Sequence, residues 1–398
     1  MSSTPCPYPF QRPAALEHPK ELATLRDEPL VPVILPSGDR AMLVSRYEDV
    51  RNLLTDERLS RNLNRPGAAR ISRNNQMFQD PRINPDPPEH TRVRRLVSKA
   101  FTPHRVKRLE PYVQSVVDDL LDGMERGTCP VDLNEALAFP LPIRVVCTLL
   151  GVPAGDIELF RHWTDSFLSI SKFDGSQIRQ AMTEMNSYIA SLIEARREAP
   201  GDDLVSAMIK ARDEDEGRLS EYELHWWCRL LLLVGYETTA TQLGGGIAML
   251  LAHPQQLALL RADMSLIPNA IEELLRWKIV GSSVSMLRFA VRDIAIRDDG
   301  LIAEGTSIIP AVDSANQDPS VFANPGKFDI TRTDNPHLTF SAGPHFCIGA
   351  ALARAELQIA TESLLRRFPT LRLAVPASEL RRQDGALLEG FLEIPVTW

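Results

Sequence analysis

Helical periodicity covers the middle of the chain, from about Pro103 to Leu275, and constrains the fold more than any other feature. Segments such as VKRLEPYVQSVVDDLLDGM and GSQIRQAMTEMNSYIASLIEARREA place apolar residues three and four positions apart, the spacing of one helix face. Strand-like stretches are short and lie near the two ends, in VPVILPSG, AMLVS, DIAIRD, TSIIPAV, LRLAV and FLEIPVTW. The pattern predicts a mainly α fold with a small β portion made from sequence-distant pieces.

Composition limits the class of protein. Hydrophobic residues make up 44% and charged residues 24% of the 398 residues, which is ordinary globular usage. The net charge of −8 argues against nucleic acid and against an anionic membrane as partners. The five cysteines are odd in number, widely spaced and free of CxxC pairs, so neither a disulfide framework nor a zinc site is expected. Because no apolar run has signal-peptide or membrane-spanning length, we expect a cytoplasmic protein.

A cysteine precedes the last long helical pattern of the chain. The segment FSAGPHFCIG runs from Phe340 to Gly349, and a helical pattern follows Cys347 as far as Phe368. A cysteine at a helix N-terminus is stabilised as a thiolate by the helix dipole and by free N–H groups. A thiolate can ligate haem iron, and its electron density then favours O–O cleavage. Taken alone, however, a single cysteine is more often a buried structural residue.

Polar side chains interrupt an otherwise apolar helical pattern near residue 237. An acid and two hydroxyls stand together there, as Glu237, Thr238 and Thr239. Burying such groups costs free energy unless they are hydrogen-bonded or used. A threonine hydroxyl can also bond to the carbonyl one turn earlier and bend the helix. Further along, the run from Gly244 to Gly246 is unfavourable inside a helix by about 1 kcal/mol per glycine. Such a run can permit close packing, but the sequence does not show which neighbour would pack there.

The cysteine loop resembles that of the cytochrome P-450 family, in its soluble bacterial branch. The family loop reads Phe-x-x-Gly-x-x-x-Cys-x-Gly, which Phe340, Gly343, Cys347 and Gly349 match. Ser341 stands where a glycine is common, which changes the strain of the turn but not the ligand. Three further motifs occur in the family's order, so the resemblance covers nearly the whole chain.

The resemblance implies the fold and the cofactor. We expect a single cytochrome P-450 domain over residues 1–398, with a short N-terminal tail of about residues 1–12. It implies haem b (iron protoporphyrin IX) with Cys347 as its metal ligand. The haem is expected between the oxygen-activation helix, which carries Glu237, and the helix that follows the cysteine loop.

Two more motifs follow from the resemblance. Val234 to Thr238 reads VGYET and is similar to the family's Ala-Gly-x-Glu-Thr, in which the acid and the alcohol deliver protons during O2 activation; Glu237 and Thr238 are therefore the expected catalytic residues. Glu273 and Arg276 share a helix face and taken alone would be a surface ion pair worth well under about 1 kcal/mol. In the family such a pair is closed by a later basic residue, here Arg332, and has a structural role.

Haem carries two propionates that need cationic partners. The resemblance assigns them to a histidine and an arginine four residues apart, to an arginine after the Glu-x-x-Arg helix, and to a histidine in the cysteine loop. These are His90, Arg94, Arg288 and His345. Arginine suits this role because it is always charged and can form two hydrogen bonds to one carboxylate.

The function implied by the resemblance is O2-dependent monooxygenation of a small organic substrate. A microbial natural product is expected, because relatives tailor secondary metabolites and because the segments expected to line the substrate pocket mix Asn, Gln and Ser with apolar residues. One alternative is a peroxide-driven haem-thiolate oxidase or an oxidative coupling enzyme, which would not need the acid and alcohol. A haem sensor or carrier is a third, and no output module for one is visible.

The electron donor is expected to be separate. No flavin-binding GxGxxG follows a strand, and no cysteine cluster for an iron–sulfur centre occurs. The resemblance implies a ferredoxin and a ferredoxin reductase. The segment from Arg92 to Arg108 holds seven Arg and Lys residues and no acid. We therefore predict that this segment is the docking surface for an acidic ferredoxin, against the alternative of a merely solvated basic face.

Overall fold

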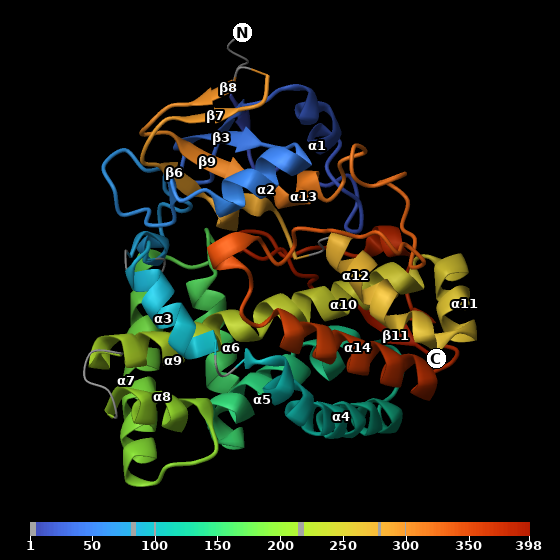
Figure 1. The fold of residues 1–398 in the computed structure, drawn as a ribbon. Coiled ribbons are helices and arrows are strands. Elements are labelled where there is room, and N and C mark those ends of the chain that lie inside the picture. The colour runs from blue at the N-terminus through green and yellow to red at the C-terminus, as the bar shows by residue number, and fades with distance from the viewer. Residues whose placement is uncertain (1–4, 81–84, 99–100, 214–218, 278–279, 299) are drawn as a thin grey trace.

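The computed structural model describes residues 5–80, 85–98, 101–213, 219–277, 280–298 and 300–398. Helices form most of the molecule, and the largest sheet lies at the end where the N-terminus is found (Figure 1). The helices are α1 (Glu21–Thr24), α2 (Tyr47–Thr55), α3 (Glu89–Ser98), α4 (Pro103–Arg126), α5 (Pro140–Leu150), α6 (Ile157–Phe167), α7 (Gly175–Glu198), α8 (Leu204–Asp213), α9 (Glu221–Gly235), α10 (Glu237–Leu251), α11 (Pro254–Ala262), α12 (Ile267–Trp277), α13 (Val312–Ala315) and α14 (Ala350–Arg367). The expected helical middle region is confirmed.

The strands come from distant parts of the chain, as the sequence predicts. They are β1 (Cys6–Pro7), β2 (Val31–Ile34), β3 (Arg40–Val44), β4 (Leu59–Ser60), β5 (Val131–Asp132), β6 (Arg288–Ala290), β7 (Ile294–Ile296), β8 (Gly300–Ile302), β9 (Ser307–Pro310), β10 (Arg372–Leu373) and β11 (Pro395–Thr397). The largest sheet has the order β1-β2-β3-β9-β6-β4, β10-β11-β5 form a second, and β7-β8 form a hairpin. β3 and β9 pair in parallel, with Met42 opposite Ile308.

The expected N-terminal tail of about residues 1–12 is partly wrong. Cys6 and Pro7 pair with β2 in parallel register, and Tyr8 is buried with 2% of its surface exposed. The Tyr8 hydroxyl accepts a hydrogen bond from the Ser283 backbone N–H over 2.9 Å. The tail is held because this tyrosine is an apolar ring with a polar end, and both parts find partners in the core.

α9 and α10 cross the centre of the molecule and are separated at Tyr236 (Figure 1). The glycine run in α10 lies where the helix meets two neighbours at close range. A Cβ on Gly244 would lie 2.5 Å from Asn134 Oδ1, and a Cβ on Gly246 would lie 3.3 Å from Leu274 Cδ1. The intrinsic cost of these glycines is therefore offset by close packing against Asn134 and Leu274, two neighbours that the sequence alone does not identify.

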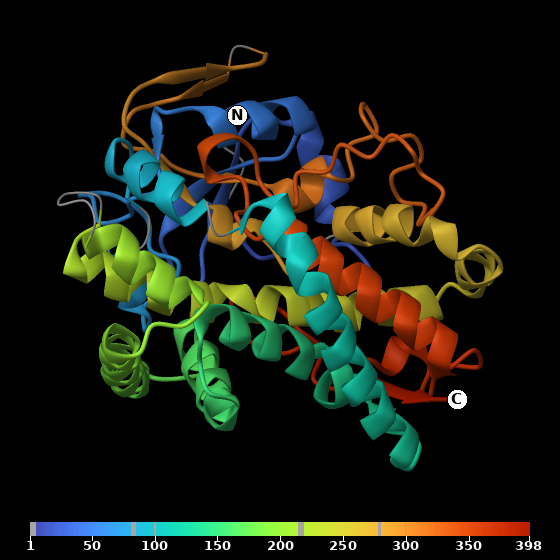
Figure 2. The ribbon, with the colours of Figure 1, turned by 60° about the horizontal axis from the view of Figure 1, so that its bottom comes forward.

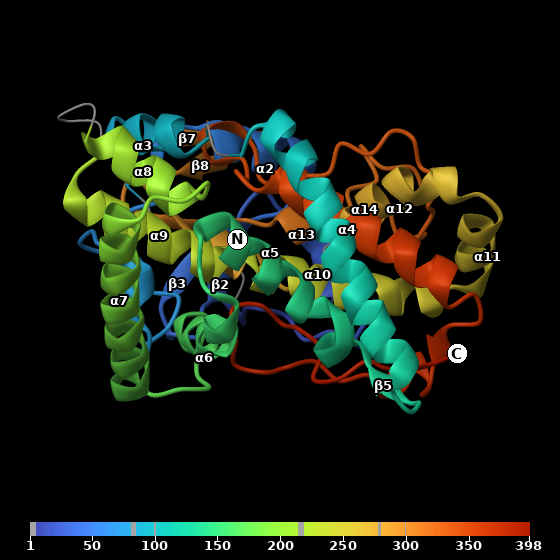
Figure 3. The same cartoon turned by 90° about the horizontal axis from the view of Figure 1, so that it is seen from below.

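α4 and α14 lie side by side below the central helices, as two views show (Figures 2 and 3). After α13 the chain runs without regular structure as far as a short 3-10 turn at Gly343–His345, just before α14. In the described part of the chain, no single helix is long and apolar enough to cross a membrane. The segments Glu221–Leu251 and Pro254–Ala262 together have the length and apolar composition of a membrane span, but the chain bends by 99° between them.

Candidate active site

The Cys347 loop is fixed by backbone contacts just ahead of α14. The Cys347 N–H donates to the Phe340 carbonyl over 2.8 Å, which closes the loop on itself. Gly343 has a φ of +66°, and a Cβ there would lie 2.8 Å from Thr55 Cγ2, so this position needs glycine. Ser341 also has a positive φ, +64°, which costs a residue with a side chain some backbone strain. Ser341 therefore strains the turn, as the sequence predicts for a serine in place of the family's glycine.

Cys347 lines a cavity of about 360 Å³ between the loop and the central helices. Across the cavity stand Val234 and Thr238, at the end of α9 and the start of α10. Both are exposed, Val234 to 40%, although most of their neighbours in these helices are buried. One exposed turn of an otherwise buried helix facing a cysteine across a cavity is the arrangement expected for a bound cofactor.

The hydroxyl and the acid of the central helix face different surroundings. Thr238 Oγ1 donates to the Val234 carbonyl over 3.2 Å, the predicted bond to the preceding turn, next to the break at Tyr236. Glu237 is buried and does not line the Cys347 cavity. Burial and the nearby Asp165 raise the pKa of Glu237 to about 7, against the lowering effects of Tyr236, Arg161 and Lys172.

Cationic and imidazole side chains gather at one side of the cavity and include all four predicted propionate partners. The His90 and His345 rings lie 4.1 Å apart between centroids. Arg94 donates to the Phe346 carbonyl, so α3 contacts the cysteine loop directly. Arg288 is buried and donates to the carbonyls of Met286 and Leu287 over 2.8 and 3.1 Å.

Arg61 is a member of this cluster that the sequence analysis missed. It stands directly after β4, lines the cavity with His345, and its charge acts on His90, His345 and Arg288. Burial and the neighbouring Arg94 lower the pKa of Arg61 to about 10. No periodic or motif signal in the segment that begins at this residue indicates contact with the other cations.

The charges of this cluster fit a cofactor with two carboxylates. Burial and the surrounding arginines lower the pKa of His90 to about 4 and of His345 to about 2, and burial lowers that of Arg288. Among the described residues, Asp86 is the carboxylate whose charge raises the pKa values of His90 and Arg288 and so opposes this lowering. His90 Nδ1 and Arg288 Nη2 are buried without a hydrogen-bond partner in the protein. Buried donors and cations of this kind require anionic acceptors.

The sulfur of Cys347 is suited to be a ligand of haem iron. Burial raises the pKa of the Cys347 thiol, while the Gly349 N–H, Arg94 and Arg354 act in the opposite direction. A thiol whose pKa is raised by burial needs a cation to ionise, and coordination to a metal deprotonates it. Cys347 therefore suits the iron of a haem, and the propionate-type cluster suits its carboxylates.

The Glu273–Arg276 pair lies behind the site and is buried rather than on the surface. Both side chains are 0% exposed, and the two hydrogen bonds between them are 2.8 Å long. Arg332 Nε lies 3.2 Å from Glu273 Oε2, which confirms the predicted third member. Arg276 also donates to the carbonyls of Asn316 and Pro325, so the pair ties α12 to the long loop. Breaking a buried pair of this kind costs about 3–5 kcal/mol, far more than a surface pair.

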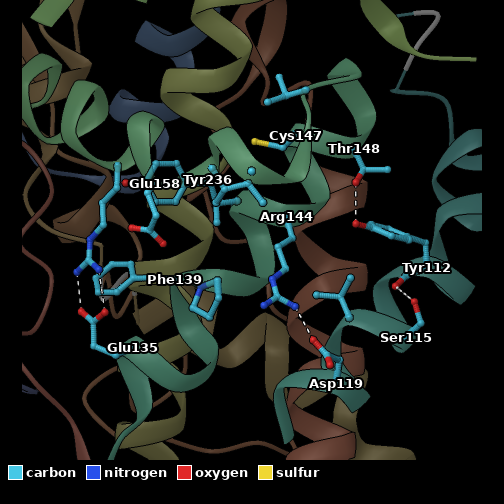
Figure 4. Close-up of a pocket in the computed structure, with 17 residues that line it drawn as sticks. Tyr112, Ser115, Asp119, Glu135, Phe139, Arg144, Cys147, Thr148, Glu158 and Tyr236 are labelled. Atoms are coloured by element: carbon cyan, nitrogen blue, oxygen red, sulfur yellow. Dashed lines mark hydrogen bonds and ion pairs between the residues drawn. The ribbon is translucent and has the colours of Figure 1, made fainter. Parts of the chain in front are cut away.

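A larger cleft, of about 550 Å³, opens among α4, α5 and α6 and does not include Cys347 (Figure 4). Four of its charged groups are paired, Arg161 with Glu135 over 2.6 Å and Arg144 with Asp119 over 2.6 Å. Tyr236 reaches this cleft. The turn that carries Glu237 and Thr238 thus has the Cys347 cavity on the Thr238 side and this cleft at Tyr236.

Known proteins resemble this chain over its whole length. A family model for cytochrome P-450 matches residues 157–382. Nocardicin C N-oxygenase from Nocardia uniformis subsp. tsuyamanensis is 40% identical, with 98% of each chain covered. Mycinamicin IV hydroxylase/epoxidase from Micromonospora griseorubida is 40% identical over 100% of each chain. Among solved structures, the LnmA hydroxylase from the leinamycin pathway of Streptomyces atroolivaceus has a TM-score of 0.88 and 40% identity, covering 98% of this chain and 100% of the other.

Proposed function

The chain belongs to the cytochrome P-450 family, and we propose that it binds haem b through Cys347 and oxidises a microbial natural product. As a member it is a haem-iron monooxygenase, which uses O2 and electrons from a redox partner to oxidise a small organic molecule. The observation that carries the proposal is the placement of Cys347 opposite the exposed turn of Val234 and Thr238, across one cavity.

The residues of the site divide into those that would hold the iron and those that would hold the propionates. Cys347 would hold the iron, and His90, Arg94, Arg288 and His345 would hold the propionates, with Arg61 as a further partner. When bound, the haem iron supplies the activation of O2. The protein's own part is to fix the thiolate, to neutralise the carboxylates, and to bring protons through Thr238 and Glu237. Water and protons would reach Glu237 from the cleft at Tyr236.

Arg61→Ala is expected to weaken haem retention by about 10- to 100-fold, since a hydrogen-bonded charge of this kind is worth about 1.5–3 kcal/mol. The measurement is the rate at which haem transfers from the variant to excess apomyoglobin. Arg65→Ala is the matched control, because Arg65 lies on the same loop and pairs with Asp86 over 3.1 Å outside the cavity. Transfer from Arg61→Ala at the parent rate would show that Arg61 is a substrate-pocket residue instead.

The cavity wall supports a substrate that is largely apolar with polar groups. Val234, Val280, Met286 and Leu388 supply apolar surface, and Gln242, Ser282 and Ser285 supply hydrogen-bonding groups. Two relatives are named for nocardicin C and mycinamicin IV. A panel of macrolides and peptide-derived metabolites should be screened for compounds that displace iron-bound water, as read by the shift of the haem Soret band. Hits should then stimulate consumption of O2 and reductant, and a panel without hits would turn the search to other substrate classes.

The electron donor is proposed to be an acidic ferredoxin, served by a ferredoxin reductase, that docks near α3 and the start of α4. The hydrogen bond from Arg94 to the Phe346 carbonyl supports this, because it places α3 beside the cysteine loop. Four basic residues of the segment are exposed, namely Arg95, Arg105, Lys107 and Arg108. The sequence predicts that Arg92 is part of this surface, but Arg92 forms an ion pair with Glu223 of α9 instead. Lys99 lies outside the described residues.

Charge reversal at Arg95 or Arg105 is expected to slow ferredoxin-driven reduction several-fold at low salt, and added salt should slow the parent in the same way. Charge steering of weak encounters is screened over about 8 Å at physiological ionic strength. The readout is the stopped-flow rate of haem reduction. Arg126→Glu is the control, because it lies at the far end of α4, about 30 Å from Arg105 at 1.5 Å per residue. Equal slowing by Arg126→Glu would rule out a local docking surface.

A further inference from the structure

A second charged cluster joins α12, the cysteine loop and α14 behind Cys347. Arg354 of α14 donates from Nε and Nη2 to the two carboxylate oxygens of Glu272, over 2.7 and 2.8 Å. His337 Nε2 lies 3.0 Å from Glu272 Oε2. Burial alone would raise the pKa of Glu272, but the bonds from Arg354 and His337 lower it to about 2. Glu272 is therefore ionised at any working pH, and it is distinct from Glu273, which binds Arg276.

The Arg354 guanidinium also stacks on the cysteine loop itself. Its Cζ lies 4.6 Å from the centre of the Phe340 ring. Phe340 is the residue whose carbonyl accepts the Cys347 N–H, so Arg354 is one contact away from the backbone that positions the sulfur. The bidentate pairing with Glu272 fixes the plane of the guanidinium, and a fixed plane is what stacking on a ring requires.

We propose that Arg354 is a positioning residue that limits how strongly the Cys347 thiolate donates electrons, and that Glu272 holds it in place and cancels part of its charge. The proposal rests on Cys347 being the iron ligand. A positive charge beside a thiolate in a partly buried site stabilises the negative charge on sulfur and withdraws it from the metal. The Arg354 and Glu272 side chains are 32% and 28% exposed, so solvent screens their charges only in part.

The two members of the pair should act in opposite directions. Arg354→Gln removes a positive charge, so the ferric form is favoured and the midpoint potential falls. Glu272→Gln removes the negative charge that offsets Arg354, so the midpoint potential rises. At the midpoint potential of the parent, each variant should have a ferrous-to-ferric ratio that differs several-fold from that of the parent. The measurement is a spectroelectrochemical titration of the holoenzyme at one neutral pH. The carbon monoxide stretching frequency of the reduced protein should fall in Arg354→Gln and rise in Glu272→Gln, because a stronger donor weakens the C–O bond.

Opposite signs separate this role from a structural one, since loss of either partner would loosen the loop in the same way. Arg354→Lys keeps the positive charge, so its midpoint potential should stay near that of the parent. This variant also tests the proposal if Arg354→Gln does not fold. The exposed pair Arg366–Glu362, 2.7 Å apart on the same helix, is the control, and its glutamine variants should not shift the potential. Shifts of the same sign, no shifts, or an Arg354→Lys shift as large as that of Arg354→Gln would overturn the proposal. A parent without a thiolate-type carbon monoxide spectrum would instead refute Cys347 as the ligand.

Discussion

Cys347→His is expected to abolish the strongly red-shifted absorption band of the reduced protein with carbon monoxide, together with monooxygenase activity. The band is characteristic of haem iron ligated by a thiolate, and the electron density that Cys347 would donate favours O–O cleavage. An imidazole at the same place is a neutral ligand and can supply neither effect. Haem should still bind, because the cluster of His90, Arg94, Arg288 and His345 is unchanged.

Cys147→Ala is the matched control for this change. Cys147 is a buried cysteine, and burial raises the pKa of its thiol to about 12, so it remains a thiol. It lines the cleft of Figure 4 and not the Cys347 cavity. The control should keep the thiolate-type band at full intensity. An unchanged spectrum in Cys347→His would show that another group ligates the iron.

The parts of this fold that are predictable from sequence are those with a periodic or motif signal. Helices of the middle region repeat apolar residues at helical spacing, and the strands at the two ends alternate or run apolar over a few residues. The Cys347 loop and the Glu273–Arg276 spacing are local patterns of fixed length. Their partners lie far away in the chain, yet the spacing within each motif survives, which is why both were located correctly.

What the sequence did not reveal depends on distant contacts without a local signal. Arg61 stands in an irregular loop, and only the folded chain brings it beside His345. The burial of Glu273 and Arg276 follows from the loop that covers them and not from their spacing. Likewise, Arg92 reads as one more positive charge until α9 places Glu223 next to it. In each case tertiary packing decides the role of the residue.

Proton supply at the site is proposed to depend on two adjacent residues in different environments, Glu237 and Thr238. Glu237 is buried beside Asp165, and these two conditions raise its pKa to about 7, where a carboxyl group can both hold and release a proton. Thr238 faces the cavity that Cys347 lines. A proton passed from the buried acid to the cavity by way of the hydroxyl would thus move within the first turn of α10, next to the break at Tyr236.

Glu237→Gln should therefore flatten the pH dependence of coupled turnover. In the parent, the protonated fraction of Glu237 falls as pH rises through about 7, so product formation should fall over that range. An amide has no proton to lose there, and the variant should be slow at every pH. The ratio of product formed to reductant consumed, measured from pH 6 to pH 8.5, tests this expectation. A parent-like pH profile in Glu237→Gln would assign the titration to another group.

Thr238→Ala should leave haem and substrate binding nearly intact and lower product formation by on the order of 10²-fold or more, as expected for a lost general acid. Consumed reductant should then appear as hydrogen peroxide, because O–O cleavage needs the proton that the hydroxyl conveys. The Thr238 hydroxyl also donates to the Val234 carbonyl, so its loss could act by reshaping the helix break. Thr238→Ser separates the two effects in combination with Thr238→Val, since serine keeps the hydroxyl and valine keeps the shape. Serine should restore coupling and valine should not; full coupling in the alanine or valine variant would contradict the role of Thr238.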